Sequence, residues 1–281
     1  MRTASILAAA LLAIQPVAQA GDDAEVLRKA WAQWRDVFGT GQHPSVTTRE
    51  EQFKEAGLSY QGSLTVPLKG SFSCKSESQL RVLSGMLAYD ASYAVMFARK
   101  KEFLETVQFM TSDVEQRVDG IDSLPLPVAV RALRKALSED ISNEETLQKF
   151  GEQGRKQLGI LVEKAATDPK TTALLMDYWY GWSLQGLYVL CSLGRSGEGG
   201  EAMVQLFNRQ LQNTERLEKL YLAFAGTDFA KQVSQADRCN LFRSVEELIR
   251  SRQGRLNRKD VKALLEKIQS ARADFVRPCT K

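Results

Sequence analysis

The chain has 281 residues, of which 43% are hydrophobic and 26% are charged, and its formal net charge is +4 at pH 7. These values are typical of globular proteins and exclude an intrinsically disordered chain, and the length fits one large helical domain. The charge is uneven, because residues 229–281 carry 13 Lys and Arg against 6 Asp and Glu. The C-terminal segment is therefore the basic pole of the protein.

The first twenty residues predict a cleaved signal peptide. Arg2 precedes an apolar run over residues 6–14, and Ala18-Gln19-Ala20 supplies small residues just before Gly21. The run is shorter than the roughly 20 residues that a membrane span needs. We therefore expect a periplasmic or secreted bacterial protein, with one helical domain over residues 21–281. Because no cysteine follows the cleavage site, a lipid anchor is not expected.

Apolar residues recur every three or four positions along most of the remaining chain, which is the period of an amphipathic α-helix. The pattern predicts helices over residues 24–38, 76–99, 101–118, 127–140, 143–166, 170–194, 200–225, 229–252 and 258–275. Short connections favour antiparallel neighbours. The expected fold class is all-α, an antiparallel bundle of about eight or nine helices.

Residue types that cap helices mark three of the predicted starts, and a fourth candidate, Thr48, lies where no helix is predicted. Thr48 and Ser142 are each followed three residues later by Glu, which is a capping-box pattern. Asp168 precedes a proline, and Asn257 stands before the last predicted helix. We expect these four side chains to accept hydrogen bonds from first-turn N–H groups.

Residues 39–73 break the helical pattern. The segment is rich in Gly, Ser and Thr, and only Leu64, Val66 and Leu68 alternate as in a strand. We expect an irregular excursion with a short strand or hairpin, which either has a function or covers one end of the bundle. The segment holds His43, the single histidine of the chain, so a metal site built on imidazoles is not expected.

A weak internal repeat relates two helical hairpins at an offset of 95 residues. Its matched positions are Leu87 with Trp182, Asp90 with Gln185, and Tyr93 with Tyr188. Each copy is a long apolar helix, a turn and a second amphipathic helix. Two such hairpins related by an approximate twofold axis would line the middle of the bundle with their first helices. If those helices run antiparallel, the ends that carry Cys74 and Cys191 approach each other.

The two first helices also carry a resemblance. The stretches GMLAYDASYA (residues 85–94) and YGWSLQGLY (residues 180–188) resemble two hallmark stretches of a group of bacterial exported all-helical proteins with no known activity. The similarity covers mainly residues 75–225. Many members of the group are lipoproteins, whereas this chain lacks the lipid-acceptor cysteine. The resemblance implies an exported helical fold and implies no activity.

Four widely spaced cysteines predict structural disulfides in an oxidising compartment. Four cysteines allow three pairings, and none has the C-x-x-C spacing of a metal or redox motif. Cys239 and Cys279 flank the predicted C-terminal hairpin, so their pairing would tie the C-terminus to the preceding helix. That pairing leaves Cys74 with Cys191.

A polar and aromatic set on the two central helices is the candidate ligand site. Asp90 stands among apolar residues, so it must be hydrogen-bonded or have a shifted pKa. Its repeat partner Gln185 cannot act as an acid, which argues against a paired-carboxylate mechanism. The pair could instead fix helix register through hydrogen bonds to tyrosines or backbone. The candidate ligand-binding residues are Asp90, Tyr93, Tyr180, Trp182, Gln185 and Tyr188.

The basic C-terminal hairpin, residues 228–281, is the second candidate surface. Its charges could attract an anionic partner such as a lipid headgroup, an acidic glycan or an acidic protein, and the candidate residues are Arg250, Arg252, Arg255, Arg258 and Lys259. They could equally be the solvated face of two amphipathic helices. Neither a nucleic-acid motif nor a cofactor or metal motif is present, so none of these ligands is expected.

Two functions follow from these features. The first is a non-enzymatic periplasmic binding module that uses a central groove or the basic hairpin to hold a protein, a glycan or a small molecule of the cell envelope. The second is a carboxylate-dependent cell-envelope hydrolase centred on Asp90, because a glycosidase needs only two suitably placed acids. A solvent-reachable cavity at Asp90 would favour the hydrolase, and a packed bundle centre would favour the binding module.

Overall fold

The computed structural model describes residues 25–26, 28–32, 46–194, 200–224 and 235–279, in which the regular secondary structure is helical and no β-strand occurs. The predicted all-α class is therefore confirmed. The α-helices after the N-terminal one are α2 (Val46–Glu55), α3 (Glu77–Met96), α4 (Lys100–Phe109), α5 (Pro125–Glu139), α6 (Glu144–Ala165), α7 (Pro169–Leu193), α8 (Gly200–Phe224), α9 (Gln235–Ser251) and α10 (Arg258–Val276). A π-helical turn, Met110–Val114, follows α4, and 3₁₀ turns occupy Gly62–Leu64, Glu115–Arg117 and Ile121–Ser123.

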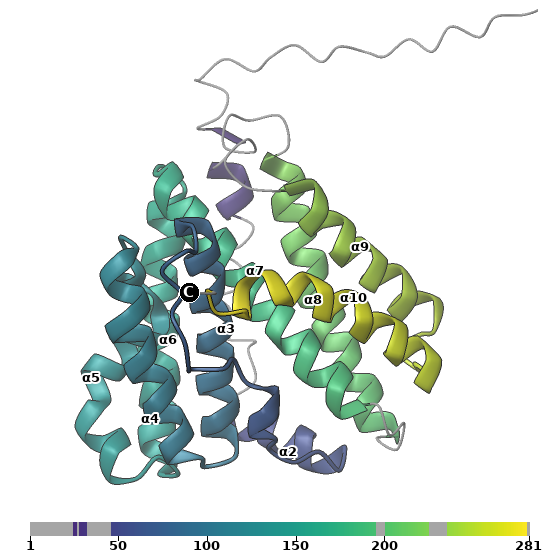
Figure 1. The fold of residues 1–281 in the computed structure, drawn as a ribbon, viewed down its shortest axis with the longest axis horizontal. Helices are drawn as coiled ribbons and strands as arrows, with labels where there is room; N and C mark the ends of the chain where they lie inside the picture. The colour runs from purple at the N-terminus through teal and green to yellow at the C-terminus, as the bar shows by residue number, and fades with distance from the viewer. Residues whose placement is uncertain (1–24, 27, 33–45, 195–199, 225–234, 280–281) are drawn as a thin grey trace, which may run out of the picture.

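Helices α3 and α7 form the centre of the bundle, with α4, α5 and α6 on one side and α8 and α9 on the other (Figure 1). Helix α10 lies across this arrangement and brings the C-terminus back to α3 (Figure 1). Each central helix is followed by a helix that packs on it, α4 on α3 and α8 on α7. The two hairpins expected from the repeat are therefore adjacent, at the centre of the fold.

Two glycines let the central helices approach closely. A Cβ atom on Gly85 would lie 1.9 Å from the carbonyl oxygen of Tyr178, and a Cβ on Gly181 would lie 1.9 Å from that of Val82. Each glycine thus faces the carbonyl three residues before the other glycine. This reciprocity is what two helices related by a twofold axis produce.

The central helices run in the same direction, contrary to the antiparallel arrangement considered from the repeat. Arg81 contacts Asp177 near the start of each helix, and Asp90 contacts Gln185 further along both. Contacts that advance together along two helices require a parallel pair. An offset of 95–96 residues therefore places repeat-related residues side by side, and the start of one helix lies far from the end of the other.

The disulfide differs from both expected pairings, because the path of α10 determines where the C-terminus lies. Cys74 is bonded to Cys279, and Cys191 and Cys239 are buried free thiols. Since α10 crosses back over the bundle, the C-terminus reaches the segment before α3 and not the start of α9. The disulfides predicted between Cys239 and Cys279 and between Cys74 and Cys191 are wrong for this reason.

Helix starts follow the sequence signals in two of four cases. Asp168 accepts a hydrogen bond from the Lys170 N–H, and Asn257 forms a capping box with Asp260. At α6 the N-cap is Asn143, which accepts from the Thr146 N–H, while Ser142 bonds to Asp140. The predicted Ser142 cap is thus displaced by one residue, because the amide oxygen of Asn143 reaches the first turn. Thr48 is the third residue of α2 and does not precede it.

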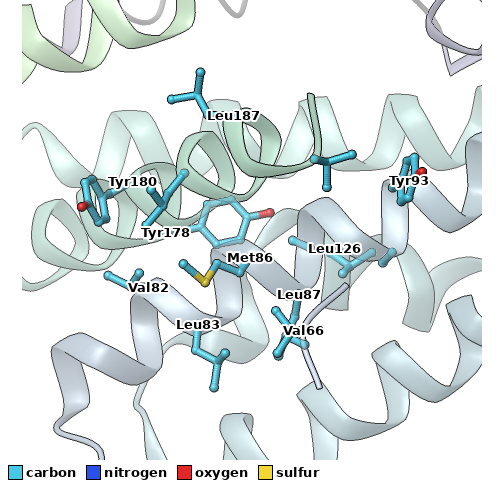
Figure 2. Close-up of a cluster of buried hydrophobic side chains, with 14 of the residues drawn as sticks. Val66, Val82, Leu83, Met86, Leu87, Tyr93, Leu126, Tyr178, Tyr180 and Leu187 are labelled. Atoms are coloured by element: carbon cyan, nitrogen blue, oxygen red, sulfur yellow. The ribbon is translucent and has the colours of Figure 1, made fainter. Parts of the chain in front are cut away.

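The segment predicted as irregular is partly helical. Helix α2 and the 3₁₀ turn at Gly62–Leu64 lie within it, and the described part contains no strand, so the expected strand or hairpin is not formed there. Val66 is buried and lies near Leu87 of α3 (Figure 2). The predicted signal peptide, residues 1–20, and His43 lie outside the described residues.

The interior is packed with side chains from the central pair and its neighbours (Figure 2). Met86 and Leu87 of α3, and Leu187 of α7, have no exposed surface. From the N-terminal helix, Trp31 is 1% exposed and donates a hydrogen bond of 3.0 Å to the Thr172 hydroxyl. Within the described ranges, no helix is both long enough and apolar enough to cross a membrane.

Candidate functional site

Asp90 and Gln185, singled out in the sequence, meet in the centre of the bundle. The Gln185 Nε2 group donates to Asp90 Oδ1 at 2.7 Å, and the Gln185 Oε1 atom accepts from Arg272 Nε at 2.7 Å. The carboxylate and the guanidinium are thereby joined through one carboxamide. This Asp90–Gln185–Arg272 network connects α3, α7 and α10.

The segment before α3 closes the same network from its other side. The Val66 N–H donates to Asp90 Oδ2 at 2.7 Å, and Gln185 Nε2 also donates to the Leu64 carbonyl at 2.9 Å. Both carboxylate oxygens of Asp90 therefore accept a hydrogen bond from the chain itself. The network fixes an otherwise weakly patterned segment onto three helices.

Burial dominates the electrostatics of the network. Asp90 is only 1% exposed, and burial raises its pKa to about 7 although the hydrogen bonds from Val66 and Gln185 and the charge of Arg272 act to lower it. Burial also lowers the pKa of the Arg272 guanidinium. That guanidinium lies 4.2 Å from the ring centre of Tyr188, a cation–π contact that offsets part of its lost hydration.

The remaining candidate residues divide among three places. Tyr93 holds the segment before α3, because its hydroxyl accepts from the Gln61 N–H and donates to the Ser59 carbonyl, both at 3.0 Å. Tyr180 lies under the guanidinium of Arg238. Trp182 packs edge-on against Tyr89. Asp90, Gln185 and Tyr188 thus share one network, while Tyr93, Tyr180 and Trp182 make separate contacts elsewhere.

A second buried network was not anticipated from the sequence. Asp177, fully buried, accepts from Arg81 Nε at 2.8 Å and from Arg238 Nη1. Arg272 and Asp177 both carried a signal that could have identified them. Arg272 continues the apolar stripe of Leu265 and Ile268 on α10, and Asp177 interrupts an apolar helix. A charged residue on an apolar helix face is expected to be buried with a partner.

The basic residues of the C-terminal hairpin gather around the turn between α9 and α10. Arg250 pairs with Glu215, Arg252 with Asp260, and Arg255 with Glu201, and the three arginine side chains are 63%, 50% and 70% exposed. Arg258 and Lys259 are exposed at the start of α10. Arg250, Arg252 and Arg255 thus also serve internal ion pairs, two of them with α8.

The central network is suited to holding helices together. Asp90 cannot reach a substrate in this conformation, because it is buried and both of its oxygens are engaged. Within the described residues, no cluster of three or more His, Cys, Asp or Glu side chains could hold a metal ion. Comparison of the chain with protein-family models, curated proteins and solved structures found no match.

Proposed function

We propose that this protein is a non-enzymatic helical binding module of the bacterial cell envelope. The resemblance to exported helical proteins bears only on the exported location. The observation that carries the non-enzymatic part is the position of Asp90. A general acid or base must come within hydrogen-bond reach of its substrate. A carboxylate that is 1% exposed and accepts from Val66 and Gln185 serves the fold instead.

The exported location is supported by the Cys74–Cys279 disulfide, since such bonds persist in oxidising compartments. It is also supported by the signal-peptide pattern of residues 1–20.

The basic tip, which we define as residues 250–259, is the proposed partner surface. The side chains of Arg250, Arg252 and Arg255 are half exposed or more. The Arg255–Glu201 pair is exposed on both sides, and pairs of that kind contribute only about 0–1 kcal/mol. An anionic partner can therefore compete for these guanidinium groups, and Arg258 and Lys259 add two exposed cations next to them. We propose an anionic partner of the cell envelope at this tip.

Charge reversal tests the proposal with a matched control. The Arg258→Glu/Lys259→Glu variant and the Arg155→Glu/Lys156→Glu variant each reverse one exposed Arg-Lys pair, on α10 and α6 respectively. Binding to vesicles that contain phosphatidylglycerol and to heparin is measured over a salt series, with neutral vesicles as a reference. We expect the α10 variant to bind more weakly at low salt and the α6 variant to bind like the wild type. Equal loss in both variants, or no binding to either probe, would contradict an anionic partner at the tip.

The alternative, a carboxylate-dependent envelope hydrolase, has its own test. Digestion of peptidoglycan by the purified protein is compared with digestion by Asp90→Asn, with circular dichroism as the control for folding. Activity that is present in the wild type and lost in a folded Asp90→Asn variant would replace the binding module with the hydrolase.

A further inference from the structure

A surface cavity of about 380 Å³ lies near the disulfide, and none of its lining residues belongs to the basic tip. Its volume is at the low end of the 300–1,000 Å³ range of small-molecule sites. Residues 70–73 form one wall, and the end of α4 with the turns that follow it forms the other. The lining residues used below are Phe72, Ser73, Phe109, Asp113, Val114 and Arg117.

The floor of the cavity is aromatic and closely packed. Phe72 and Phe109 are 5% and 9% exposed and pack edge to face, with ring centres 5.7 Å apart. Val114, 1% exposed, completes the apolar surface. An apolar group of a ligand would replace water over this floor.

The rim carries one positive and one negative side chain. Asp113 and Arg117 are both exposed and line the same cavity. In an α-helix, residues four apart form ion pairs. Here the chain widens into the π-helical turn at Met110–Val114 and then narrows into the 3₁₀ turn at Glu115–Arg117, and the two side chains make no ion pair with each other. π-Helical turns within helices occur frequently at functional sites.

Both charges remain available to a ligand. Arg117 donates from Nη1 to the Phe72 carbonyl at 2.8 Å and from Nη2 to the Ser73 carbonyl at 3.1 Å, and these neutral acceptors do not cancel its charge. Asp113 accepts from the Ser112 hydroxyl through Oδ2. Among the described residues, neither side chain forms an ion pair with another.

The wall that bears Phe72 and Ser73 is held in place from behind. The Cys279 N–H donates to the Ser71 carbonyl at 2.8 Å, and the disulfide joins Cys279 to Cys74. A site whose wall is fixed before binding loses less conformational entropy when the ligand arrives. The cavity is therefore preorganised.

We propose that this cavity binds a small zwitterion with an apolar side chain, the chemistry of a free apolar amino acid. The ligand carboxylate pairs with Arg117, the ammonium group pairs with Asp113, and the side chain lies on Phe72, Phe109 and Val114. The proposal concerns a different surface from the basic tip and does not depend on the anionic partner.

Nuclear magnetic resonance of the purified protein tests the site with L-phenylalanine, L-leucine and L-valine as probes. N-acetyl-L-phenylalanine amide, which lacks both charges, and glycine, which lacks the side chain, are the ligand controls. We expect shifts of the Phe72, Phe109 and Val114 signals and, for at least one probe, affinity at least about tenfold higher than for either control, because charge-assisted hydrogen bonds are lost in one and apolar burial in the other.

Two isosteric variants make the test specific. Asp113→Asn removes the rim carboxylate, and Asp119→Asn removes an exposed carboxylate that does not line the cavity. We expect the first to weaken binding of the preferred probe about tenfold or more and the second to leave it unchanged. The proposal is overturned if no probe binds at millimolar concentration, if the uncharged amide binds as tightly, or if the two variants behave alike.

Discussion

Asp90 and Arg272 are joined through the two ends of a single carboxamide, because Gln185 donates to the carboxylate at 2.7 Å and accepts from the guanidinium at 2.7 Å. A direct ion pair would join two side chains, whereas this arrangement joins three and also holds the Leu64 carbonyl, and it leaves the buried Nη2 of Arg272 without a hydrogen bond. The Gln185 side chain on α7 therefore forms hydrogen bonds to α3, to α10 and to the segment before α3 at the same time.

Replacement of Gln185 by methionine should therefore be severely destabilising. Methionine has a similar volume, but it leaves Arg272 without its amide partner and Asp90 with one donor fewer in a buried site. We expect the free energy of unfolding to fall by about 3–5 kcal/mol, the cost of breaking a buried charged network. Urea denaturation followed by circular dichroism measures this loss. A loss below about 1 kcal/mol would show that the network contributes little.

The glycine crossing gives a second prediction with an internal control. Gly85→Ala places a methyl group 1.9 Å from the Tyr178 carbonyl oxygen, so α3 and α7 must separate. We expect a loss of about 3 kcal/mol or more. Gly159→Ala on α6 has nothing within 4 Å of the new Cβ and should instead stabilise the protein by roughly 0.5–1 kcal/mol. Thermal unfolding of both variants compares the two effects, and similar destabilisation by both would refute the close crossing.

The disulfide predicts a specific thiol count. Alkylation of the unfolded protein without reductant should modify two cysteines, Cys191 and Cys239, and reduction before alkylation should expose all four. Mass spectrometry of the intact chain measures both numbers. Peptide mapping should then find the linked pair Cys74–Cys279, and recovery of a Cys239–Cys279 peptide would contradict the structure.

Loss of this bond should lower stability substantially. It closes a loop with a sequence separation of 205 residues, which corresponds to about 5 kcal/mol in the chain-entropy model. We expect Cys279→Ser to shift the urea midpoint to lower concentration. Cys239→Ser, which removes a free thiol, should have a much smaller effect, and equal shifts would argue against the assigned pairing.

Stability should also fall as the pH rises, partly because of Glu246. Burial raises the pKa of this carboxyl to about 7, and the neighbouring carboxylates Glu218 and Glu215 add to the rise. The native state then holds a proton that the unfolded state releases near pH 4, so the stabilisation is complete below that pH and is lost as the pH passes through 7.

Glu246→Gln copies the protonated form and removes this loss. Relative to the wild type, we expect it to be more stable by about 1–2 kcal/mol at pH 8 and no more stable at pH 4. Glu247→Gln changes the adjacent, exposed residue and should alter stability at neither pH. A gain at pH 8 that is equal in the two variants would show that general charge reduction is responsible.

The helical elements could be predicted from apolar periodicity because burial of one helix face determines both pattern and structure. Helix α2 was missed because it buries so little. Its sequence, VTTREEQFKE, is mostly polar. Among the side chains of this helix that the structure describes, Phe53 is the large apolar one that is buried. No periodic stripe was available to identify it, and its place depends on contacts with α3 and α8.

The central site was predictable only in part. Asp90 and Gln185 were paired through the repeat, and they do contact each other. Their third member, Arg272, comes from a helix 87 residues further along the chain, so only the path of α10 across the bundle brings it there. The disulfide failed as a prediction for the same reason, because spacing along the chain says nothing about where α10 ends.

The covalent ring formed by Cys74 and Cys279 encloses all the helices from α3 to α10. A protease that cuts any single bond between these cysteines would produce two pieces that stay tethered. On a gel without reductant such nicked protein would migrate as one species, and fragments would separate only after thiol treatment. As long as the disulfide stays oxidised, the protein would thereby survive a first cleavage in one piece.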